Sequence, residues 1–355
     1  MSLIRSYAVW NNKGGVGKST ITFHLASTYA LKHPECRVLV IDLCPQANAS
    51  MMLLDGGAQS EDRVLELSQL ETPRTVVGYL ATVLSQGPGA TRPNPQDFLV
   101  QVVNQNSQLP SNLWLLSGDG NLEPMAPLIS ERASQAALIP NQDPWLWVHG
   151  IIRRFIEDLS ARPGEEWLVL VDTNPSFSIY TEIAISSVER LVVPVNADDS
   201  SRVATTAMFT LIYGATPRHP VYGKYTYASR ADAAGLRRPD VHLIIGNRLT
   251  EYKGPAVAFN AISEATANSL FAAHQAFPQR FTSVDHPINN VSEFRDAYST
   301  TLRDFNTAGV VAAHLGTPLS ALRSGDYLVH GSSVQVSKDR ASECSRAVEA
   351  VVERL

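Results

Sequence analysis

The chain contains 355 residues, 44% of them hydrophobic, with 29 lysines and arginines against 34 acidic residues and a formal net charge of −5. This length and composition are enough to bury a large core in one domain or two. The small negative charge excludes nucleic-acid binding driven by net charge, although a local basic patch stays compatible with it.

Cysteine usage and apolar patterning bear on where the protein resides. Cys36, Cys44 and Cys344 have neither a metal-binding spacing nor a Cys-x-x-Cys pair, which argues against a disulfide framework and fits a reducing cytoplasm. The N-terminal sequence MSLIRSYAVW lacks the long apolar core of a signal peptide, and no run approaches the ~20 apolar residues of a membrane span. We therefore expect a cytoplasmic protein without a membrane anchor.

Short apolar runs alternate along the chain with longer segments of helical periodicity. The segment 6–12 is predicted to be a strand that enters a glycine-rich loop, and 19–32 the helix that leaves it. A further helical signal lies at 201–214. Apolar runs of the central-strand type lie at 37–43, 167–174, 190–197 and 242–249. This alternation predicts an α/β fold, a doubly wound and mostly parallel sheet flanked by helices.

The stretch from 55 to 150 is less regular. It contains a helical piece at 74–86, a glycine- and proline-rich break at 87–95 and a strand-like run at 112–119. No linker is long or polar enough to require a second domain. We therefore expect a single domain over 1–355 with an elaborated connection at 55–150.

The segment NNKGGVGKST, residues 11–20, has the composition of a phosphate-binding loop. Its glycines let successive backbone N–H groups point inward at a helix N-terminus, which creates an anion site. Lys18 then supplies a positive charge to the β and γ phosphates, and the Ser19 hydroxyl can ligate Mg²⁺. The strand before and the helix after favour this interpretation over a glycine-rich turn with incidental lysines. The predicted nucleotide contacts in this loop are Gly14, Gly15, Val16, Gly17, Lys18, Ser19 and Thr20.

Two aspartates end predicted buried strands. Asp172 is placed to hold Mg²⁺ through water, and Asp42 repeats the arrangement on a second strand. A buried aspartate without a partner costs several kcal/mol, so one in this position usually has a partner. The alternative for Asp172 is a cap of the following helix.

The base preference is inferred from the end of the run at 242–249. Guanine-specific P-loop proteins typically use an Asn/Thr-Lys-x-Asp segment, whereas this chain has Asn247 and Arg248 without a following aspartate. An amide both donates and accepts hydrogen bonds, which suits the adenine edge. ATP is therefore favoured, and the alternative for Asn247 is a turn residue at a strand end.

Taken together, these motifs resemble the ParA/MinD superfamily of deviant Walker A ATPases, and specifically its ParA branch. The shared segments occur in the family order and reach to about residue 250, whereas 313–322 and the last helix fit more loosely and 55–150 has no clear match. The segments that carry the resemblance are KGGVGKST at 13–20, VLVIDLCPQANAS at 38–50, VLVDTNPS at 169–176, VVPVNADDSS at 192–201 and the Asn-Arg pair at 247–248.

The resemblance implies a role for the second lysine of the loop, Lys13. In this family the equivalent lysine contacts the phosphates bound by the other subunit of a nucleotide-sandwich homodimer. A cation supplied in trans neutralises two triphosphates that are buried face to face, so ATP becomes a dimerisation switch. The alternative is a solvated loop charge.

The chain departs from the family at Cys44, which stands where the second aspartate of Asp-x-Asp-Pro-Gln usually orients the attacking water. A thiol is a poor substitute for a carboxylate acting on water. Either ATP hydrolysis is slow and the dimer long-lived, or another acid such as Asp42 takes the role. Nothing nearby in the sequence would activate Cys44 as a nucleophile.

The resemblance also implies non-specific DNA binding and a ParB-like partner that stimulates hydrolysis. The segment 213–239 is a candidate DNA contact because its cations can bind phosphates and its tyrosines can stack; a solvated loop is the alternative. Its basic residues are Arg218, Lys224, Arg230, Arg237 and Arg238, against the single acid Asp232, and Tyr222, Tyr225 and Tyr227 lie among them.

Other functions of the same superfamily fit this sequence less well. The MinD branch binds membranes through a basic C-terminal helix, but the tail 337–355 has balanced charges and a short stripe of Val348, Val351, Val352 and Leu355, which predicts packing onto the sheet. A reductase would need two cysteines placed to share a cluster, which Cys36 and Cys44 do not provide. A ligase or synthetase with a substrate pocket from 55–150, and a nearly inert ATP-locked scaffold, remain the alternatives.

Overall fold

The computed structural model describes residues 4–57, 59–137, 142–159, 164–196, 198–216, 219–247, 256–302, 306–329 and 331–355. Arg218 and Arg248, two of the predicted site residues, lie outside these ranges.

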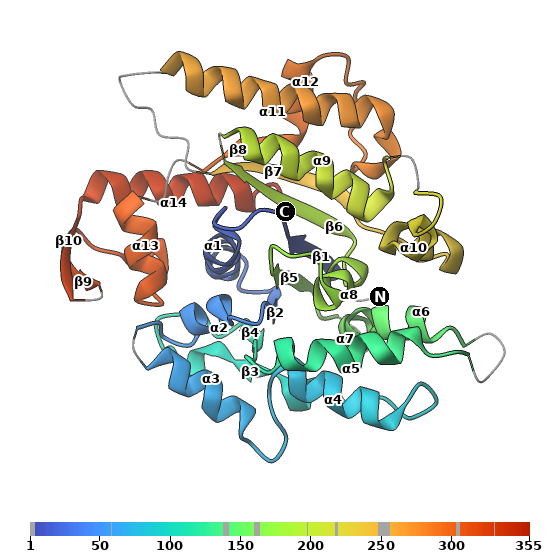
Figure 1. The fold of residues 1–355 in the computed structure, drawn as a ribbon. Helices are drawn as coiled ribbons and strands as arrows, with labels where there is room; N and C mark the ends of the chain where they lie inside the picture. Colours follow the sequence, from blue (N-terminus) through green and yellow to red (C-terminus); the bar gives the residue numbers. More distant parts are fainter. Residues whose placement is uncertain are drawn as a thin grey trace.

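A mostly parallel sheet forms the centre of the molecule (Figure 1). In the described part of the chain it has eight strands in the order β3-β4-β2-β5-β1-β6-β7-β8, and only the β3–β4 pair is antiparallel. The strands are β1 (Ile4–Val9), β2 (Arg37–Leu43), β3 (Val100–Gln101), β4 (Leu113–Leu116), β5 (Trp167–Thr173), β6 (Arg190–Asn196), β7 (Asp240–Asn247) and β8 (Ser299–Thr301). The predicted doubly wound α/β fold is therefore confirmed.

Helices cover both faces of this sheet (Figure 1). They are α1 (Lys18–Lys32), α2 (Asn48–Leu53), α3 (Ser60–Ser68), α4 (Val76–Gln86), α5 (Leu122–Ser134), α6 (Pro144–His149), α7 (Ile151–Leu159), α8 (Ile179–Ser187), α9 (Asp199–Tyr213), α10 (Tyr227–Ala234), α11 (Ala256–Ala276), α12 (Val291–Tyr298), α13 (Asn306–His314) and α14 (Lys338–Val352). Short 3-10 turns lie at Pro95–Phe98, Val102–Asn104, Gly223–Tyr225, Pro278–Arg280 and Leu319–Ala321. A separate hairpin pairs β9 (Gly325–Val329) with β10 (Ser332–Val336).

The central strand β5 shows why the apolar runs become buried strands. All of its residues are buried, and successive side chains point to opposite faces. Trp167, Val169 and Val171 therefore join the core under α4–α9, whereas Leu168 and Leu170 join the core under α1, α13 and α14. A strand with helices on both faces needs apolar residues at every position, which explains its continuous rather than alternating pattern.

The irregular segment 55–150 extends the same sheet. The predicted strand at 112–119 is β4, which pairs in parallel with β2, and the short β3 closes this edge. The predicted helix at 74–86 is α4, capped by Thr75, whose hydroxyl accepts a hydrogen bond from the Gly78 N–H at 3.1 Å. Side chains of α4, α5 and α6 pack into the core shared with β2 and β5.

The last helix packs against the rest of the molecule. The predicted apolar stripe Val348, Val351, Val352 and Leu355 is buried in the core that also contains α1. This face of α14 therefore packs within the molecule. Among the described helices, none combines the length and apolar character that crossing a bilayer requires.

Candidate nucleotide site

The glycine-rich loop between β1 and α1 has the backbone geometry of an anion site. Gly15 and Gly17 have φ angles of 71° and 82°, in the left-handed region that favours glycine. The first helical hydrogen bond runs from the Ile21 N–H to the Gly17 carbonyl at 2.8 Å. The N–H groups of the first turn before it have no partner within the helix, so they face the loop as anion donors.

Lys18, the first residue of α1, is curled over this loop. Its ammonium donates to the carbonyls of Lys13 at 3.0 Å and Asn11 at 3.4 Å. Burial lowers the pKa of Lys18 to about 8, and the nearby negative charge of Asp172 opposes that shift. The lysine therefore stays mainly protonated at neutral pH and supplies one positive charge at the mouth of the loop.

Asp172 lies against the start of α1, as predicted for a metal site. Its carboxylate accepts hydrogen bonds from the hydroxyls of Ser19 at 2.6 Å and Thr22 at 3.3 Å. The alternative role of Asp172 as a helix cap is not realised, because Ser178 occupies the N-cap of α8. A hydroxyl and a carboxylate in contact are hard oxygen donors of the kind that Mg²⁺ uses together with phosphate oxygens, so the donor set fits this ion.

Asp42 and Asp172 are paired in register on the adjacent strands β2 and β5, and both side chains are fully buried. Burial raises the pKa of Asp172 to about 7, and the neighbouring Asp42 raises it further, against the hydrogen bond from Ser19. Burial also raises the pKa of Asp42. Two adjacent buried carboxyls without a cation favour proton uptake, and a bound divalent cation would favour the ionised pair.

Both oxygens of Asp42 are engaged by the loop that follows β2. Oδ1 accepts the Cys44 N–H at 3.1 Å, and Oδ2 accepts the N–H and hydroxyl of Ser50 at 2.9 and 2.8 Å. The Ser50 hydroxyl in turn accepts the Gly118 N–H at 2.8 Å. A Cβ on Gly118 would lie 3.0 Å from Cγ of Asp42, so glycine is needed for this close approach. Asp42 therefore anchors the loop.

Cys44 lies beside this carboxylate pair with 4% of its surface exposed. Burial, followed by the negative charges of Asp42 and Asp172, raises the pKa of the Cys44 thiol to about 12. The thiol stays protonated at neutral pH, which agrees with the prediction that it is not an activated nucleophile.

The side chain of Lys13 contacts a different element from that of Lys18. Its ammonium forms an ion pair with Asp198, at the N-terminus of α9. Asp198 also accepts the N–H of Ser201 at 2.8 Å and the hydroxyl of Ser200 at 2.8 Å. Partial burial raises the pKa of Asp198, but the hydrogen bonds from Lys13, Ser200 and Ser201 outweigh it and bring the value to about 2.

Sequence reasoning missed Asp198 as a partner of this site. The signal was present in the quoted segment VVPVNADDSS, since an aspartate three residues before a serine at a helix start is a typical N-cap. Thr22 and Ser50, which hold Asp172 and Asp42, were missed as well. A threonine or a serine at these positions gives no indication, from the sequence alone, that it contacts a distant aspartate.

Asn247 ends β7 and contacts the glycine loop. Its Nδ2 donates to the Val16 carbonyl at 2.9 Å, and a Cβ on Gly17 would come within 2.6 Å of that nitrogen. Part of the Asn247 amide is thus used to hold the loop. The structure brings Asn247 to the loop, as predicted, while Arg248 lies outside the described residues.

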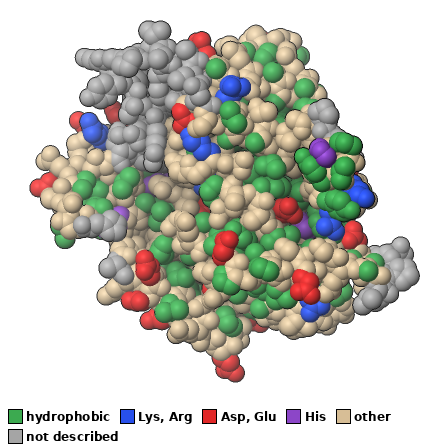
Figure 2. Space-filling view, viewed as in Figure 1, with side chains coloured by type: hydrophobic (Ala, Val, Ile, Leu, Met, Phe, Trp, Pro, Cys, Tyr) green, Lys and Arg blue, Asp and Glu red, His purple; other side chains and the backbone are tan. Residues whose placement is uncertain are grey.

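The basic segment 213–239 does not form one exposed surface, which corrects the sequence interpretation in part. Tyr222, Tyr225 and Lys224 are exposed, and Figure 2 shows hydrophobic, basic and histidine side chains gathered at the right-hand edge beside α10. Tyr227 is buried in the core. Sequence alone cannot distinguish Tyr227 from the exposed Tyr222 and Tyr225, because all three tyrosines lie in one short segment.

The arginines of this segment also separate by exposure. Arg238 is 7% exposed, pairs with Asp232 and donates to the Ile212 carbonyl at 3.2 Å. Arg230 lies over the Trp145 ring, 5.1 Å from its centroid. Arg237, with 65% of its side chain exposed, lies 4.0 Å from Asp240. Of the described arginines here, Arg237 is the one that points to solvent, and Arg238 is structural.

The combination of a parallel sheet, a glycine loop between β1 and α1, and an aspartate at the end of β5 defines a P-loop nucleotide-binding fold. Residues 4–140 match a family model described as an AAA domain. Two solved structures share the fold. McdA of Cyanothece, in complex with ATP, has a TM-score of 0.59 and 14% identity, covering 100% of this chain and 97% of that one. A plasmid partition protein of Borrelia burgdorferi B31, bound to AMPPNP, has a TM-score of 0.53 and 14% identity, with 99% coverage of both chains.

Two curated relatives match in sequence. A protein of Rhizobium rhizogenes that carries the name replication protein A is 30% identical over 189 residues, 53% of this chain and 39% of that protein. Maintenance of carboxysome distribution protein A of Gloeobacter kilaueensis is 40% identical over 87 residues, 24% of this chain and 39% of that protein. The matched segments thus span well under half of each relative. The N-terminal part of the chain therefore matches an AAA-type domain, and the chain as a whole shares its fold with the two solved structures.

Proposed function

We propose that this protein is a ParA-type ATPase that binds ATP and Mg²⁺, forms a nucleotide-sandwich homodimer and acts as a switch in DNA partition or cargo positioning. The observation that carries the proposal is the division of labour between the two lysines of one loop. Lys18 is folded over its own anion site, whereas Lys13 is paired with Asp198. A loop that served only its own nucleotide would not need this second cation, which could serve a second subunit once released from Asp198.

The nucleotide would be held by groups already in place. Backbone N–H groups of the loop Gly14–Thr20 and the ammonium of Lys18 face the phosphates. Ser19 and Asp172 would hold Mg²⁺, which supplies charge neutralisation at the β and γ phosphates. Asn247, with Arg248, would lie near adenine, and the contact of Asn247 with the loop puts its amide on that side.

Lys13 would act in trans only after it leaves Asp198. The ion pair holds the lysine to its own subunit without nucleotide, and a second subunit carrying a triphosphate would offer a stronger concentration of negative charge. Asp198 therefore opposes dimerisation when no γ-phosphate is present. This exchange makes ATP, rather than protein concentration alone, the determinant of assembly.

We propose that hydrolysis is slow. Asp42 would lie in the metal shell or beside the attacking water, but its two oxygens already accept hydrogen bonds from Cys44 and Ser50. Cys44 adds a protonated thiol where a carboxylate would orient water. This arrangement favours a long-lived ATP dimer. If hydrolysis were negligible, such a dimer would be the ATP-locked scaffold.

The partners of the proposed switch are inferred from the relatives and from one surface. Relatives named for plasmid partition and carboxysome distribution support a role in positioning DNA or another cargo, with a ParB-like activator. Non-specific DNA binding would use Tyr222, Lys224, Tyr225 and Arg237, the exposed part of 213–239. We further propose that the chain acts in the cytoplasm as a single domain without membrane binding.

The proposal is tested by multi-angle light scattering of the wild type and Lys13→Ala with ADP, with ATP and with a non-hydrolysable ATP analogue. The wild type should double in mass with the triphosphates only, and Lys13→Ala should stay monomeric while still binding nucleotide in a fluorescence titration. A wild type that remains monomeric at saturating analogue would show that the dimer switch is wrong. DNA added to the same samples tests the surface separately.

A further inference from the structure

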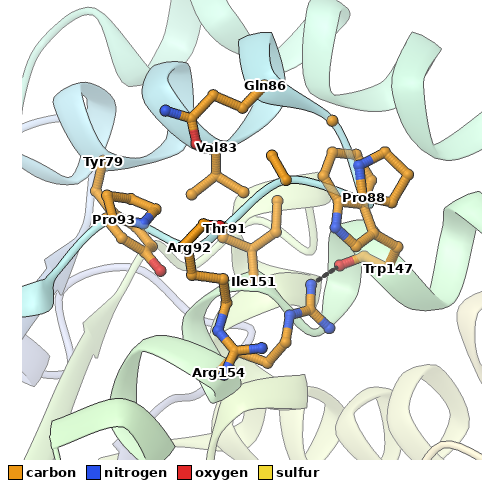
Figure 3. Close-up of a pocket in the computed structure, with 12 residues that line it drawn as sticks. Tyr79, Val83, Gln86, Pro88, Thr91, Arg92, Pro93, Trp147, Ile151 and Arg154 are labelled. Atoms are coloured by element: carbon orange, nitrogen blue, oxygen red, sulfur yellow. Dashed lines mark hydrogen bonds between the residues drawn. The ribbon is translucent and has the colours of Figure 1, made fainter.

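A cavity of 230 Å³ lies on the flank formed by α4, the loop 87–93 and the helices α6 and α7 (Figure 3). It shares no residue with the glycine loop. Its walls come from the segment 55–150, which the sequence motifs left without a function, and from the start of α7. The residues that matter for its chemistry are Tyr79, Arg92, Trp147, Gly150 and Arg154.

Tyr79 brings an unused hydrogen-bond donor to this cavity. Its side chain is fully buried, its ring packs edge-on against Phe98 and Phe155, and its hydroxyl has no hydrogen-bond partner among the described residues. A buried hydroxyl without a partner costs free energy, so its persistence calls for an explanation such as a ligand. Burial, followed by the negative charge of Asp158, raises the pKa of Tyr79 to about 12, so the phenol stays neutral and donates.

Arg154 brings a guanidinium to this cavity. Its guanidinium donates to the Trp147 carbonyl, and within the described ranges no carboxylate lies at ion-pair distance from it (Figure 3). Gly150 makes room for this position, because a Cβ there would lie 2.5 Å from Nη1 of Arg154. Burial lowers the pKa of Arg154, and the negative charges of Glu157 and Asp158 offset that shift only in part.

Among the described residues, the other charged groups around the cavity form no ion pair with Arg154. Arg92 lines the same cavity but is engaged in a two-pronged ion pair with Asp158, with both N–O distances at 2.6 Å. Glu157, on the same helix as Arg154, is exposed to solvent, and its negative charge acts on Arg154 from a distance, as that of Asp158 does. The N–H groups of Arg154 are thus available to a ligand, although the four charged side chains sum to zero net charge.

Apolar surface surrounds these polar groups. Val83, Ile151 and Pro93 line the same cavity. A second cavity of 490 Å³ adjoins it, since the two share Gln86, Pro88 and Trp147 in their walls. A pocket with an apolar body and a few convergent polar groups is typical of a small-molecule site.

We propose that this cavity binds a small organic monocarboxylate, with Arg154 and the Tyr79 hydroxyl holding the carboxylate and the apolar body lying toward Val83 and the adjoining cavity. A carboxylate matches the fork of a guanidinium and still accepts a third hydrogen bond from the phenol. A phosphate dianion would bring a second negative charge into a partly buried space that Asp158 and Glu157 already face, so a monoanion is favoured. The site is independent of the nucleotide loop and does not rest on the proposed dimer.

The test is isothermal titration calorimetry of the full-length protein without nucleotide, using benzoate and hexanoate as probes and benzamide as the uncharged match. Saturable binding of at least one carboxylate is expected, with benzamide about tenfold weaker or more, because it lacks the charge-assisted hydrogen bond. Arg154→Met should weaken carboxylate binding by a similar factor. Tyr79→Phe should weaken it severalfold, and thermal melts should show both variants folded.

Arg132→Met is the matched control. Arg132 lines only the adjoining cavity and is partly exposed, so this variant removes a nearby positive charge without touching the proposed carboxylate contacts. It should bind the probes as the wild type does. The proposal is overturned if neither carboxylate saturates, if benzamide binds as well as benzoate, or if Tyr79→Phe and Arg154→Met both retain wild-type affinity. Should Arg154→Met fail to fold, Tyr79→Phe and the benzamide comparison still decide.

Discussion

Lys13 and Asp198 form an ion pair that joins the loop after β1 to the N-terminus of α9. The two residues are 185 positions apart in the chain, and the pairing of β1 with β6 brings them together. The lysine that the family resemblance assigns to a second subunit is thus held by its own subunit in this structure. Under the proposed switch, dimerisation would depend on the competition between one internal carboxylate and the phosphates of another chain.

The substitution Asp198→Asn should favour the ATP dimer. Asparagine can still cap α9 but no longer attracts Lys13 by charge. Because the paired side chains are 21% and 41% exposed, solvent screens the pair, and we expect its loss to contribute about 0.5–1 kcal/mol, or a two- to fivefold lower dissociation constant of the dimer. Sedimentation equilibrium with a non-hydrolysable ATP analogue measures this constant. Asp62→Asn, an exposed charge on α3, is the control, and an unchanged or weaker dimer in Asp198→Asn would contradict the competition.

The nucleotide-free protein should lose stability as pH rises through neutrality because of Asp172. Its pKa is raised to about 7 in the folded state and lies near 4 in the unfolded chain. The folded state therefore binds the extra proton, so this stabilisation is complete below pH 4 and is lost as pH rises through 7. Each pKa unit corresponds to about 1.4 kcal/mol, so Asp172→Asn should be more stable than the wild type at pH 8 by a few kcal/mol.

Thermal melts of both proteins between pH 5 and pH 8 measure this effect. His24 acts in the opposite direction, because burial lowers its pKa to about 4 and its stabilisation is lost as pH falls from 6.5 toward that value. His24 is present in both proteins, so its contribution cancels in the difference in stability between the wild type and Asp172→Asn. A difference that does not change with pH would show that Asp172 is ionised in the folded protein throughout.

Replacing Cys44 with aspartate should raise ATP turnover if the missing carboxylate limits hydrolysis. Positioned acid–base groups contribute about 10²–10⁴-fold to rates, and a tenfold gain in kcat would already support the proposal. The same variant should melt at a lower temperature without nucleotide, because it places a third buried carboxyl beside Asp42 and Asp172. Cys44→Asn is the uncharged control. Unchanged turnover in Cys44→Asp would assign the role to another group.

Gly17→Ala should abolish nucleotide binding. The φ angle of 82° disfavours alanine, and its Cβ would come within 2.6 Å of Nδ2 of Asn247, so the Asn247 side chain must move and lose its hydrogen bond to the Val16 carbonyl. Strain of this kind costs about 1–3 kcal/mol before the clash is counted. Gly235→Ala has a φ of 66° and nothing within 4 Å, and it therefore isolates the backbone strain. Fluorescent-ATP titrations should show binding retained in Gly235→Ala and lost in Gly17→Ala.

The two neighbouring arginines of 213–239 should behave differently. Arg237→Gln should reduce the slope of log binding constant against log salt for non-specific DNA by about one, as expected for one lost phosphate contact. Arg238→Gln should instead lower the melting temperature, because it removes the ion pair with Asp232 and changes a buried position. Fluorescence anisotropy at several salt concentrations, paired with thermal melts, separates the two outcomes. An unchanged slope in Arg237→Gln would remove this surface from the DNA hypothesis.

Local patterns were enough to predict much of this molecule. Continuous apolar runs located β2, β5, β6 and β7, because strands buried on both faces need apolar residues at every position. The order of glycines and lysines in NNKGGVGKST predicted the anion loop, because a turn with left-handed backbone at a helix start depends on residues close together in sequence. The apolar stripe of the last helix predicted its burial for the same local reason.

Only the tertiary structure decided which distant residues meet. The register of β2 and β5 places Asp42 beside Asp172, and the strand order brings Asp198 to Lys13. Burial separated Arg238 from Arg237, and packing of α4 against α7 created the cavity around Tyr79 and Arg154. The periodicity of a short segment shows which face of its own helix or strand is buried. The distance between two remote residues and the solvation of a charge depend instead on strand order, register and helix packing, and no short segment contains that information.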